Sequence, residues 1–370
     1  MLIILLSFVI SFVLVAFMLP YVLILSLRKR LIDPIDPRKV HSVPASRLGG
    51  LTFFPSFLFS MWFCISLTHL TQSIFGVEID IDVSLIMETL ALLSLYIIGV
   101  YDDVLGVPYR NKFAGQIFAG GLIIAAGVYF KTLHGFFGID EIPAYIGIPV
   151  TLFIYVFVTN AINLIDGIDG LASLLSIMAL LVYGIQLFHN GELEDSIFAV
   201  ATLGALVPFW YHNVFGIKKG AGSKIFMGDT GALVIGSVLG LMAVKIWNIS
   251  FYADTNAPIA SSYYVLAYTM LLVPCFDVVR IVFHRYRAKK PLFLPDKNHI
   301  HHKFMALGFS ARRSLGWIVA INICFVVINL LLSLCVSITV IVAIDIVLWT
   351  LMHLYISRCM KLYKLARQKA

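Results

Sequence analysis

Five aspartates lie at the edges of apolar segments, where a membrane protein tolerates charge least. They form three clusters along the chain: Asp102 and Asp103, Asp166 and Asp169, and Asp229. Carboxylates beside membrane-spanning segments are costly, and they therefore mark sites of function. Magnesium prefers such oxygen ligands, completed by substrate phosphates and water. The clusters predict a metal-dependent enzyme that handles phosphate groups.

Each cluster also has a purely structural interpretation. Asp102 and Asp103 could form a solvated helix end that pairs with Arg110 or Lys112, and Asp229 could cap the helix that follows it. The sequence around these aspartates excludes neither the structural nor the functional interpretation. A helix N-terminus, for example, favours anions and therefore suits a bound phosphate as well as a cap. Residues 160–170 could form a polar turn. Their density of acidic, amide and glycine residues favours a functional site there, since glycine lets the backbone approach a ligand closely.

Three histidines occur within four residues, His299, His301 and His302, in the long segment 284–313. A zinc site would need further cysteine or spaced histidine ligands, which the sequence does not supply. Histidines among arginines and lysines can instead bind or protonate phosphate oxygens. The alternative is a solvated basic loop near lipid headgroups.

Composition defines the elements that must position these residues. The chain has 370 residues, of which 60% are hydrophobic and 13% charged, and this excludes an ordinary soluble domain. Because a crossing needs roughly 20 apolar residues, the sequence predicts an all-α polytopic membrane protein with about eleven transmembrane helices. One of these is centred near residue 122, and the last two are separated by a turn near 335–337. We expect one integral-membrane domain over residues 1–370.

Lysines and arginines predict the orientation, because they stay mostly on the cytoplasmic side. They occur in alternate connections, and only Lys131 and Lys245 fall in the other set. The N-terminus is therefore expected outside and the C-terminus inside, with every polar cluster on the cytoplasmic side. The net charge of +7 fits this topology and attraction to anionic lipid. Neither nucleic-acid binding nor disulfides among the five scattered cysteines are expected.

Five segments in order make the chain resemble a known superfamily. They are 38–41 with 47–50, 102–103, 160–170, 226–231 and 299–302. Along almost its whole length the chain is similar to the polyprenyl-phosphate N-acetylhexosamine-1-phosphate transferases, glycosyltransferase family 4. The His-Ile-His-His spacing resembles the undecaprenyl-phosphate GlcNAc-1-phosphate transferase branch more than the related phospho-MurNAc-pentapeptide translocases.

The resemblance implies an enzyme of the bacterial inner membrane with a cytoplasmic active-site cleft. It would transfer an N-acetylhexosamine-1-phosphate, expected to be GlcNAc-1-phosphate, from a UDP-sugar to undecaprenyl phosphate. UMP would be released and a lipid-linked cell-envelope glycan begun. Mg²⁺ is the implied cofactor, with Mn²⁺ as a substitute, and homodimerisation is left open. Another UDP-amino sugar or UDP-MurNAc-pentapeptide remains an alternative donor. A secondary transporter is the alternative from another class, but the acids lie at one membrane edge and no repeat is found.

The resemblance also implies roles for individual residues. Asp102, Asp103 and Asp229 match the catalytic aspartates, and Asp229 with Asp102 would hold the metal. The residues expected to bind substrate are Lys39, Arg47, Asn160, Asn163, Leu164, Asp166, Asp169, Asn213, Phe226, His299, His301 and His302. Residues 216–222 look like an insertion between Asn213 and Phe226.

Overall fold

The computed structural model describes residues 1–29, 31–33, 45–74, 83–216, 224–252, 260–291 and 298–369. Lys39 lies outside these residues, so its assignment to the substrate site stays a prediction. The apolar segments are helical, because a helix satisfies its own backbone polar groups where no water is present.

The helices fall into two groups along the chain. The first group comprises α1 (Leu2–Lys29), α2 (Phe53–Ile74), α3 (Val83–Leu105), α4 (Tyr109–Ala125), α5 (Ala144–Ile165), α6 (Leu171–His189), α7 (Leu193–Phe215) and α8 (Gly228–Tyr252). The second comprises α9 (Ala260–Met270), α10 (Leu272–Arg287), α11 (Ile300–Ala306), α12 (Ala311–Ser333) and α13 (Ile338–Lys369). The short elements are β1 (Ile32–Asp33), β2 (Ala45–Ser46), the 3₁₀ helix η1 (Leu48–Thr52), β3 (Thr132–Phe136) and β4 (Ile139–Glu141). Strands β1 and β2, and likewise β3 and β4, pair antiparallel.

Nine helices in the described part of the chain are long and apolar enough to cross a membrane. The bent pair Tyr263–Met270 and Leu272–Arg287, with an angle of 52° between its halves, raises the number to as many as ten. The predicted span near residue 122 falls on α4, which has only 17 residues. A polytopic helical protein is therefore confirmed, whereas the count of eleven and the orientation stay predictions. The predicted turn near 335–337 is confirmed, since it separates α12 from α13.

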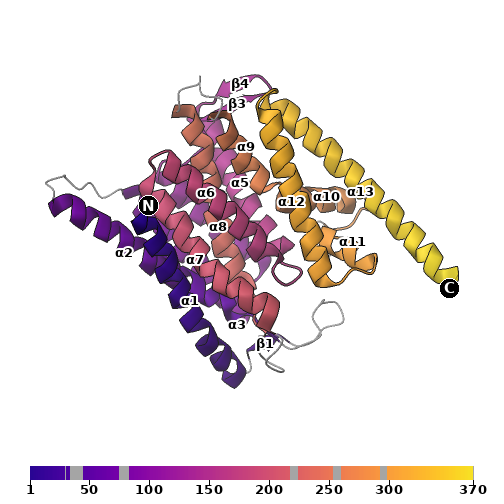
Figure 1. Ribbon diagram of the computed structural model, residues 1–370, viewed down its shortest axis with the longest axis horizontal. Coiled ribbons are helices and arrows are strands. Elements are labelled where there is room, and N and C mark those ends of the chain that lie inside the picture. The colour runs from indigo at the N-terminus through magenta and orange to yellow at the C-terminus, as the bar shows by residue number, and fades with distance from the viewer. Residues whose placement is uncertain are drawn as a thin grey trace.

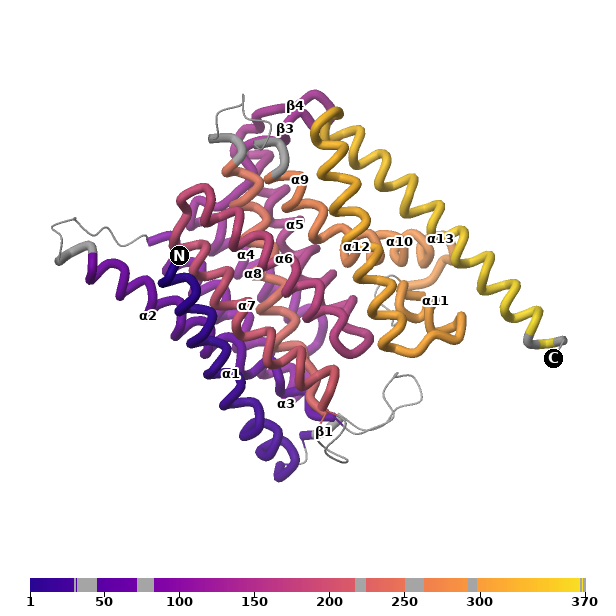
Figure 2. Tube along the Cα trace, viewed as in Figure 1, coloured from indigo at the N-terminus to yellow at the C-terminus, as the bar shows by residue number. Residues whose placement is uncertain are grey.

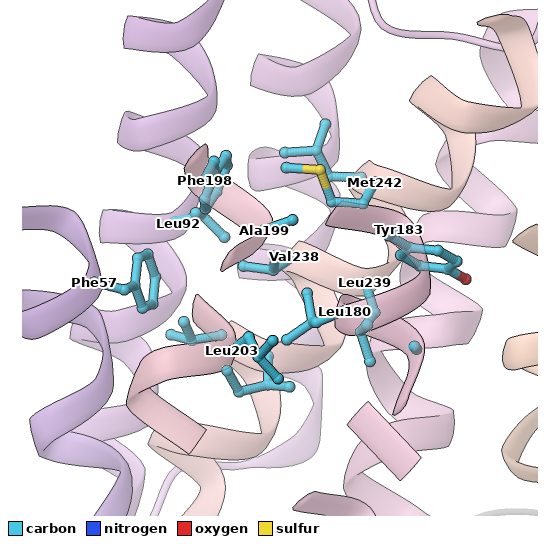
Figure 3. Packing of buried hydrophobic residues seen from close by; sticks show 14 of the residues in the cluster. Phe57, Leu92, Leu180, Tyr183, Phe198, Ala199, Leu203, Val238, Leu239 and Met242 are labelled. Carbon is cyan, nitrogen blue, oxygen red and sulfur yellow. The ribbon is translucent and has the colours of Figure 1, made fainter. Parts of the chain in front are cut away.

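The first group of helices surrounds α8, as the ribbon shows (Figure 1). Apolar side chains from α2, α3, α6, α7 and α8 meet in the main core, shown in Figure 3. Two glycines allow close approach to α8. A Cβ on Gly99 of α3 would lie 2.4 Å from Cα of Thr230, and one on Gly236 would lie 2.8 Å from Cα of Thr159 in α5. The C-terminal ends of α3 and α5 are thereby held beside the N-terminal end of α8.

The second group packs around a separate apolar cluster that includes Leu272, Ile300, Ile318 and Trp349. In Figure 1, α12 and α13 lie on the side of the bundle away from α1 and α2. The tube in Figure 2 shows α13 extending from the end that carries β3 and β4 to the C-terminus, beyond the body of the bundle. The short helix α11 lies between α12 and α13 and contacts both.

The segment before α2 packs against the segment before α8. The N–H groups of Gly49 and Gly50 donate to the carbonyls of Phe226 (3.0 Å) and Met227 (2.9 Å). The N–H of Phe226 donates to the carbonyl of Ser46 at 2.7 Å. These bonds fix the start of α8 from a part of the chain more than a hundred residues away.

Candidate active site

Two aspartates from different helices face the same cation. Nζ of Lys112 in α4 lies 2.7 Å from Oδ2 of Asp102 in α3 and 3.2 Å from Oδ1 of Asp229 in α8. The Nδ2 of Asn163 in α5 donates to the same Oδ1 of Asp229 at 2.7 Å. Four helices thus bring one lysine, one amide and two carboxylates together, although Asp102 and Asp229 are far apart in sequence.

Asp103 has a different environment from its neighbour. Its Oδ1 accepts the N–H of Asp229 at 2.8 Å, and its Oδ2 accepts the N–H and the Oγ1 hydroxyl of Thr230 at 2.9 and 2.6 Å. These are donors of the first turn of α8, which has no partners for them inside the helix. Asp103 therefore caps α8 from α3 and orients Asp229. Its predicted catalytic role stays a prediction, and this geometry favours a positioning role.

The donor set suits magnesium better than zinc. No group of three or more histidine, cysteine, aspartate or glutamate side chains within the described ranges is arranged to hold a metal ion. Mg²⁺ commonly takes only one or two carboxylates and completes its shell with substrate phosphates and water. Oxygens of Asp102 and Asp229 already converge on one positive charge, that of Lys112. The residues present therefore fit Mg²⁺, which Asp102 and Asp229 would hold.

The α5–α6 loop contributes the next two aspartates. Oδ2 of Asp169 lies 2.6 Å from Nζ of Lys224, a buried lysine whose ammonium also lies 5.1 Å from the ring centre of Phe226. Asp166 follows α5 directly and its side chain is exposed. Surrounding protein atoms, with the negative charges of Asp169 and Asp229, nevertheless raise the pKa of Asp166 above the usual aspartate range. Asp166 is thus close enough to Asp229 for their charges to interact.

We expect Asp166→Asn to unfold at a slightly higher temperature than the wild type at pH 7. A raised pKa means that the folded protein binds this proton more tightly than the unfolded chain does, so ionisation of Asp166 destabilises the fold as pH rises above about 4. Because the side chain is exposed, the gain should be small, about 2 °C. Thermal unfolding in detergent between pH 4 and 8 measures it. A difference that persists unchanged at pH 4 would exclude this electrostatic cause.

Two predicted substrate residues instead have protein partners. Oδ1 of Asn213 accepts the N–H of Gly170 at 2.6 Å, and its Nδ2 donates to the carbonyl of Ile225 at 2.8 Å. Asn213 is 4% exposed, so it ties the α5–α6 loop to the segment before α8. Asn160 pairs its amide with that of Gln116 in α4. Both geometries favour support of the site over direct contact with substrate.

Leu164 and Arg47 flank this site. Leu164 is 43% exposed near the end of α5, where a ligand can reach it. Arg47 precedes η1, and its carbonyl oxygen lies so close to Gly228 that a Cβ there would approach it to 2.1 Å. Gly228 has a φ of +69°, which also favours glycine at the start of α8.

The histidines sit at the N-terminus of α11. Nδ1 of His299 lies 2.8 Å from Oδ2 of Asp277, a fully buried carboxylate of α10 that also pairs with Arg280. The ring of His301 packs against Gly167, because a Cβ on that glycine would lie 2.2 Å from its Cε1 and Nε2. The ring of His302 lies 4.2 Å from that of His301 between centroids. The histidine segment therefore meets the aspartate-bearing loop.

His301 is held neutral and has unsatisfied ring nitrogens. Burial, with the neighbouring His302 and His299, lowers its pKa to about 3. Within the described residues, neither Nδ1 nor Nε2 has a hydrogen-bond partner, and the side chain is 1% exposed. A neutral imidazole has one donor and one acceptor, so His301 can still bind a ligand at the Gly167 loop.

Comparison with known proteins relates part of the chain to a family. Residues 85–247 match the model of glycosyl transferase family 4. This region runs from within α3 to within α8 and holds all five aspartates of the site. This part of the chain is therefore similar to glycosyl transferase family 4.

Similarity to individual proteins extends further along the chain. It is 28% identical over 290 residues to the decaprenyl-phosphate N-acetylglucosaminephosphotransferase of Mycobacterium leprae, covering 75% of this chain and 70% of that protein. It is 26% identical over 327 residues to the probable undecaprenyl-phosphate N-acetylglucosaminyl 1-phosphate transferase of Bacillus subtilis, covering 86% and 82%. It is 28% identical over 223 residues to the undecaprenyl-phosphate alpha-N-acetylglucosaminyl 1-phosphate transferase of Escherichia coli K12, covering 60% and 58%.

Several residues of this site had no assigned function in the sequence. They are Lys112, Gln116, Lys224 and Asp277. In the sequence, Lys112 was identified only as a possible ion-pair partner of Asp102 and Asp103. Lys224 was identified only as a positive charge just before residues 226–231. Gln116 and Asp277 lie inside apolar helices. A polar residue within such a helix is itself a sign of function, and this sign could have identified both.

Proposed function

We propose that this chain transfers GlcNAc-1-phosphate from UDP-GlcNAc to a polyprenyl phosphate, with release of UMP. The observation that carries the proposal is the convergence of Asp102 and Asp229 on one cation at the ends of α3, α4 and α8. The substrate class follows from the relatives, whose names give a polyprenyl phosphate and an N-acetylglucosamine phosphate. We further propose the cytoplasmic face of a bacterial inner membrane as the place of the reaction, from the distribution of lysine and arginine.

In this reaction an oxygen of the polyprenyl phosphate attacks the sugar-bearing phosphorus of the UDP-sugar. A new P–O bond forms between that oxygen and the attacked phosphorus. The bond from the attacked phosphorus to the oxygen that bridges the two phosphorus atoms breaks. UMP leaves with the bridging oxygen. Such phosphoryl transfers depend chiefly on positioning and on neutralising charge. Mg²⁺ bound to Asp102 and Asp229, or Mn²⁺ in its place, would neutralise phosphate charge when present.

The chain's own groups supply the rest. Asn163 and the α8 cap at Asp103 hold Asp229 in place. Lys112 adds positive charge where the phosphates would lie. Neutral His301 offers ring nitrogens beside the Gly167 loop. Asp169, Lys224 and Phe226 form a neighbouring polar and aromatic surface, which suits the uridine part of the donor.

A donor panel tests the proposal. Membranes that contain the chain are incubated with Mg²⁺, polyprenyl phosphate and separately labelled UDP-GlcNAc, other UDP-amino sugars and UDP-MurNAc-pentapeptide. We expect lipid-linked product and UMP with UDP-GlcNAc, and none after chelation of the metal. Product from another donor alone would change the assigned sugar, and the absence of product with every donor would overturn the proposal.

We expect Gly167→Ala to lower the transfer rate about a hundredfold, because displacements near 1 Å at such sites have effects of this size. The added Cβ would lie 2.2 Å from the ring of His301, so the ring or the loop must move. The rate of UMP release measures the effect. Gly121→Ala is the matched control, since a Cβ there meets nothing within 4 Å and activity should persist. If both variants had equal rates, the contact between Gly167 and His301 would not be needed for transfer.

A further inference from the structure

A second group of basic side chains lies between α11 and α13, next to Asp277 of α10. Nζ of Lys303 in α11 lies 3.2 Å from Nδ1 of His353 and 3.2 Å from Oγ of Ser357, both in α13. Arg280 of α10 lies within electrostatic range of Lys303 and His353. Lys303 points toward α13, whereas His301 of the same helix packs against the α5–α6 loop at Gly167. Lys303 and His353 therefore face away from the Gly167 loop, and Arg280 connects them to Asp277.

The contact between Lys303 and His353 fixes the tautomer of the histidine. An ammonium only donates hydrogen bonds, so Nδ1 of His353 must accept. In the neutral imidazole the proton then sits on Nε2, which becomes a donor. Within the described residues Nε2 has no hydrogen-bond partner, and His353 is only 6% exposed.

Two more buried N–H donors near His353 also lack a hydrogen-bond partner within the described residues. The indole of Trp349 lies 4.7 Å from the ring of His353 between centroids, and its Nε1 is buried with no partner on the described part of the chain. The same holds for Nε of Arg280. All three orphaned atoms are donors, and buried polar groups are nearly always satisfied. A ligand rich in hydrogen-bond acceptors would satisfy all three atoms.

Charge points to the same kind of ligand. Arg280 is paired with Asp277 at 2.7 Å, whereas within the described residues the side chains in hydrogen-bond contact with Lys303 are those of His353 and Ser357, neither of which is a carboxylate. The region thus carries one positive charge more than its carboxylate balances. Burial and the charge of Arg280 lower the pKa of Lys303 to about 8, so a bound anion would also favour its charged form.

The site lies toward the end of α13 at which the basic residues begin. Helix α13 begins at Ile338, so His353 stands about 22 Å and Ser357 about 28 Å along it. The hydrocarbon core is roughly 30 Å thick. The basic residues Arg358 and Lys361 follow directly and are typical of the membrane–water boundary.

We propose that Lys303, Arg280 and His353 form a binding site for the phosphate headgroup of a membrane lipid. A phosphate has only acceptors and negative charge, which matches three unsatisfied donors and one unbalanced ammonium. The inference does not depend on the transfer reaction, so either can fail alone.

Native mass spectrometry of the purified full chain tests the site. The probes are phosphatidic acid, phosphatidylcholine and inorganic phosphate, each added separately to delipidated protein. We expect one phosphatidic acid per chain at the lowest concentrations, with phosphatidylcholine binding more weakly because its headgroup carries a compensating cation. Binding of inorganic phosphate but not of phosphatidic acid would keep the anion site and exclude the lipid source. Binding of neither would overturn the proposal.

Matched variants connect that binding to these residues. Lys303→Met keeps the length of the side chain without its charge, and His353→Phe keeps the ring without its donor. Each should weaken phosphatidic acid binding about tenfold. Lys303→Arg should retain binding, and Lys361→Met, at an exposed lysine of α13, should match the wild type. Undiminished binding by Lys303→Met and His353→Phe refutes the site. Should Lys303→Met fail to fold, His353→Phe against Lys361→Met decides alone.

Discussion

Asp229→Asn should lower the rate of sugar-phosphate transfer by about three orders of magnitude, the upper range for loss of one electrostatic contact at a reacting centre. Asparagine keeps the size of the side chain and the backbone N–H that Asp103 accepts. It removes the negative charge that faces Lys112 together with Asp102. The site would then hold a divalent cation with one carboxylate instead of two. UMP release at saturating substrate and increasing Mg²⁺ measures the effect.

Excess magnesium separates binding from chemistry in this variant. Partial recovery at high Mg²⁺ would mean that Asp229 mainly sets metal affinity, and no recovery would mean that its charge is needed in the transition state. Asp140→Asn is the control, because Asp140 is exposed in β4 at the other end of the molecule and should behave as the wild type. Wild-type turnover by Asp229→Asn without added metal would remove Asp229 from the site.

Asp103→Leu should destabilise the protein by about 3 kcal/mol, because it leaves buried donors of the first turn of α8 without an acceptor. Three donors lose their partner at once, two on Thr230 and one on Asp229. Activity should fall with stability, since the start of α8 carries Asp229. Thermal unfolding in detergent, followed together with UMP release, gives both quantities for the same preparation.

A gentler substitution separates the two roles that Asp103 could have. Asp103→Asn keeps one acceptor oxygen, so a positioning residue should retain part of its activity and lose only part of its stability. A catalytic carboxylate should instead lose nearly all activity while the unfolding temperature hardly changes. Asp140→Leu, an exposed site, should leave both measurements unchanged and so reports the general effect of the substitution.

The sequence by itself determined that the apolar segments are helical and which polar clusters could converge. In lipid the backbone must satisfy itself, so apolar length directly predicts helical segments. The order of polar clusters along the chain then places the ends of α3 and α5 and the start of α8 together. The predicted convergence of aspartates is supported, since Asp102 and Asp229 share one cation and Asp166 feels the charge of Asp229.

Only the tertiary structure decided what each of these residues touches. Successive helical side chains point about 100° apart, so the rotation of α3 against α8 selects Asp102 for the cation and Asp103 for the cap. No local pattern encodes that rotation, because it depends on close packing at Gly99. For the same reason the sequence named Lys112 only as a possible partner of the aspartate pair and did not assign Lys224 to the site. Asn213, predicted to bind substrate, instead binds backbone groups. Residue types are local information, but partners depend on how distant helices pack.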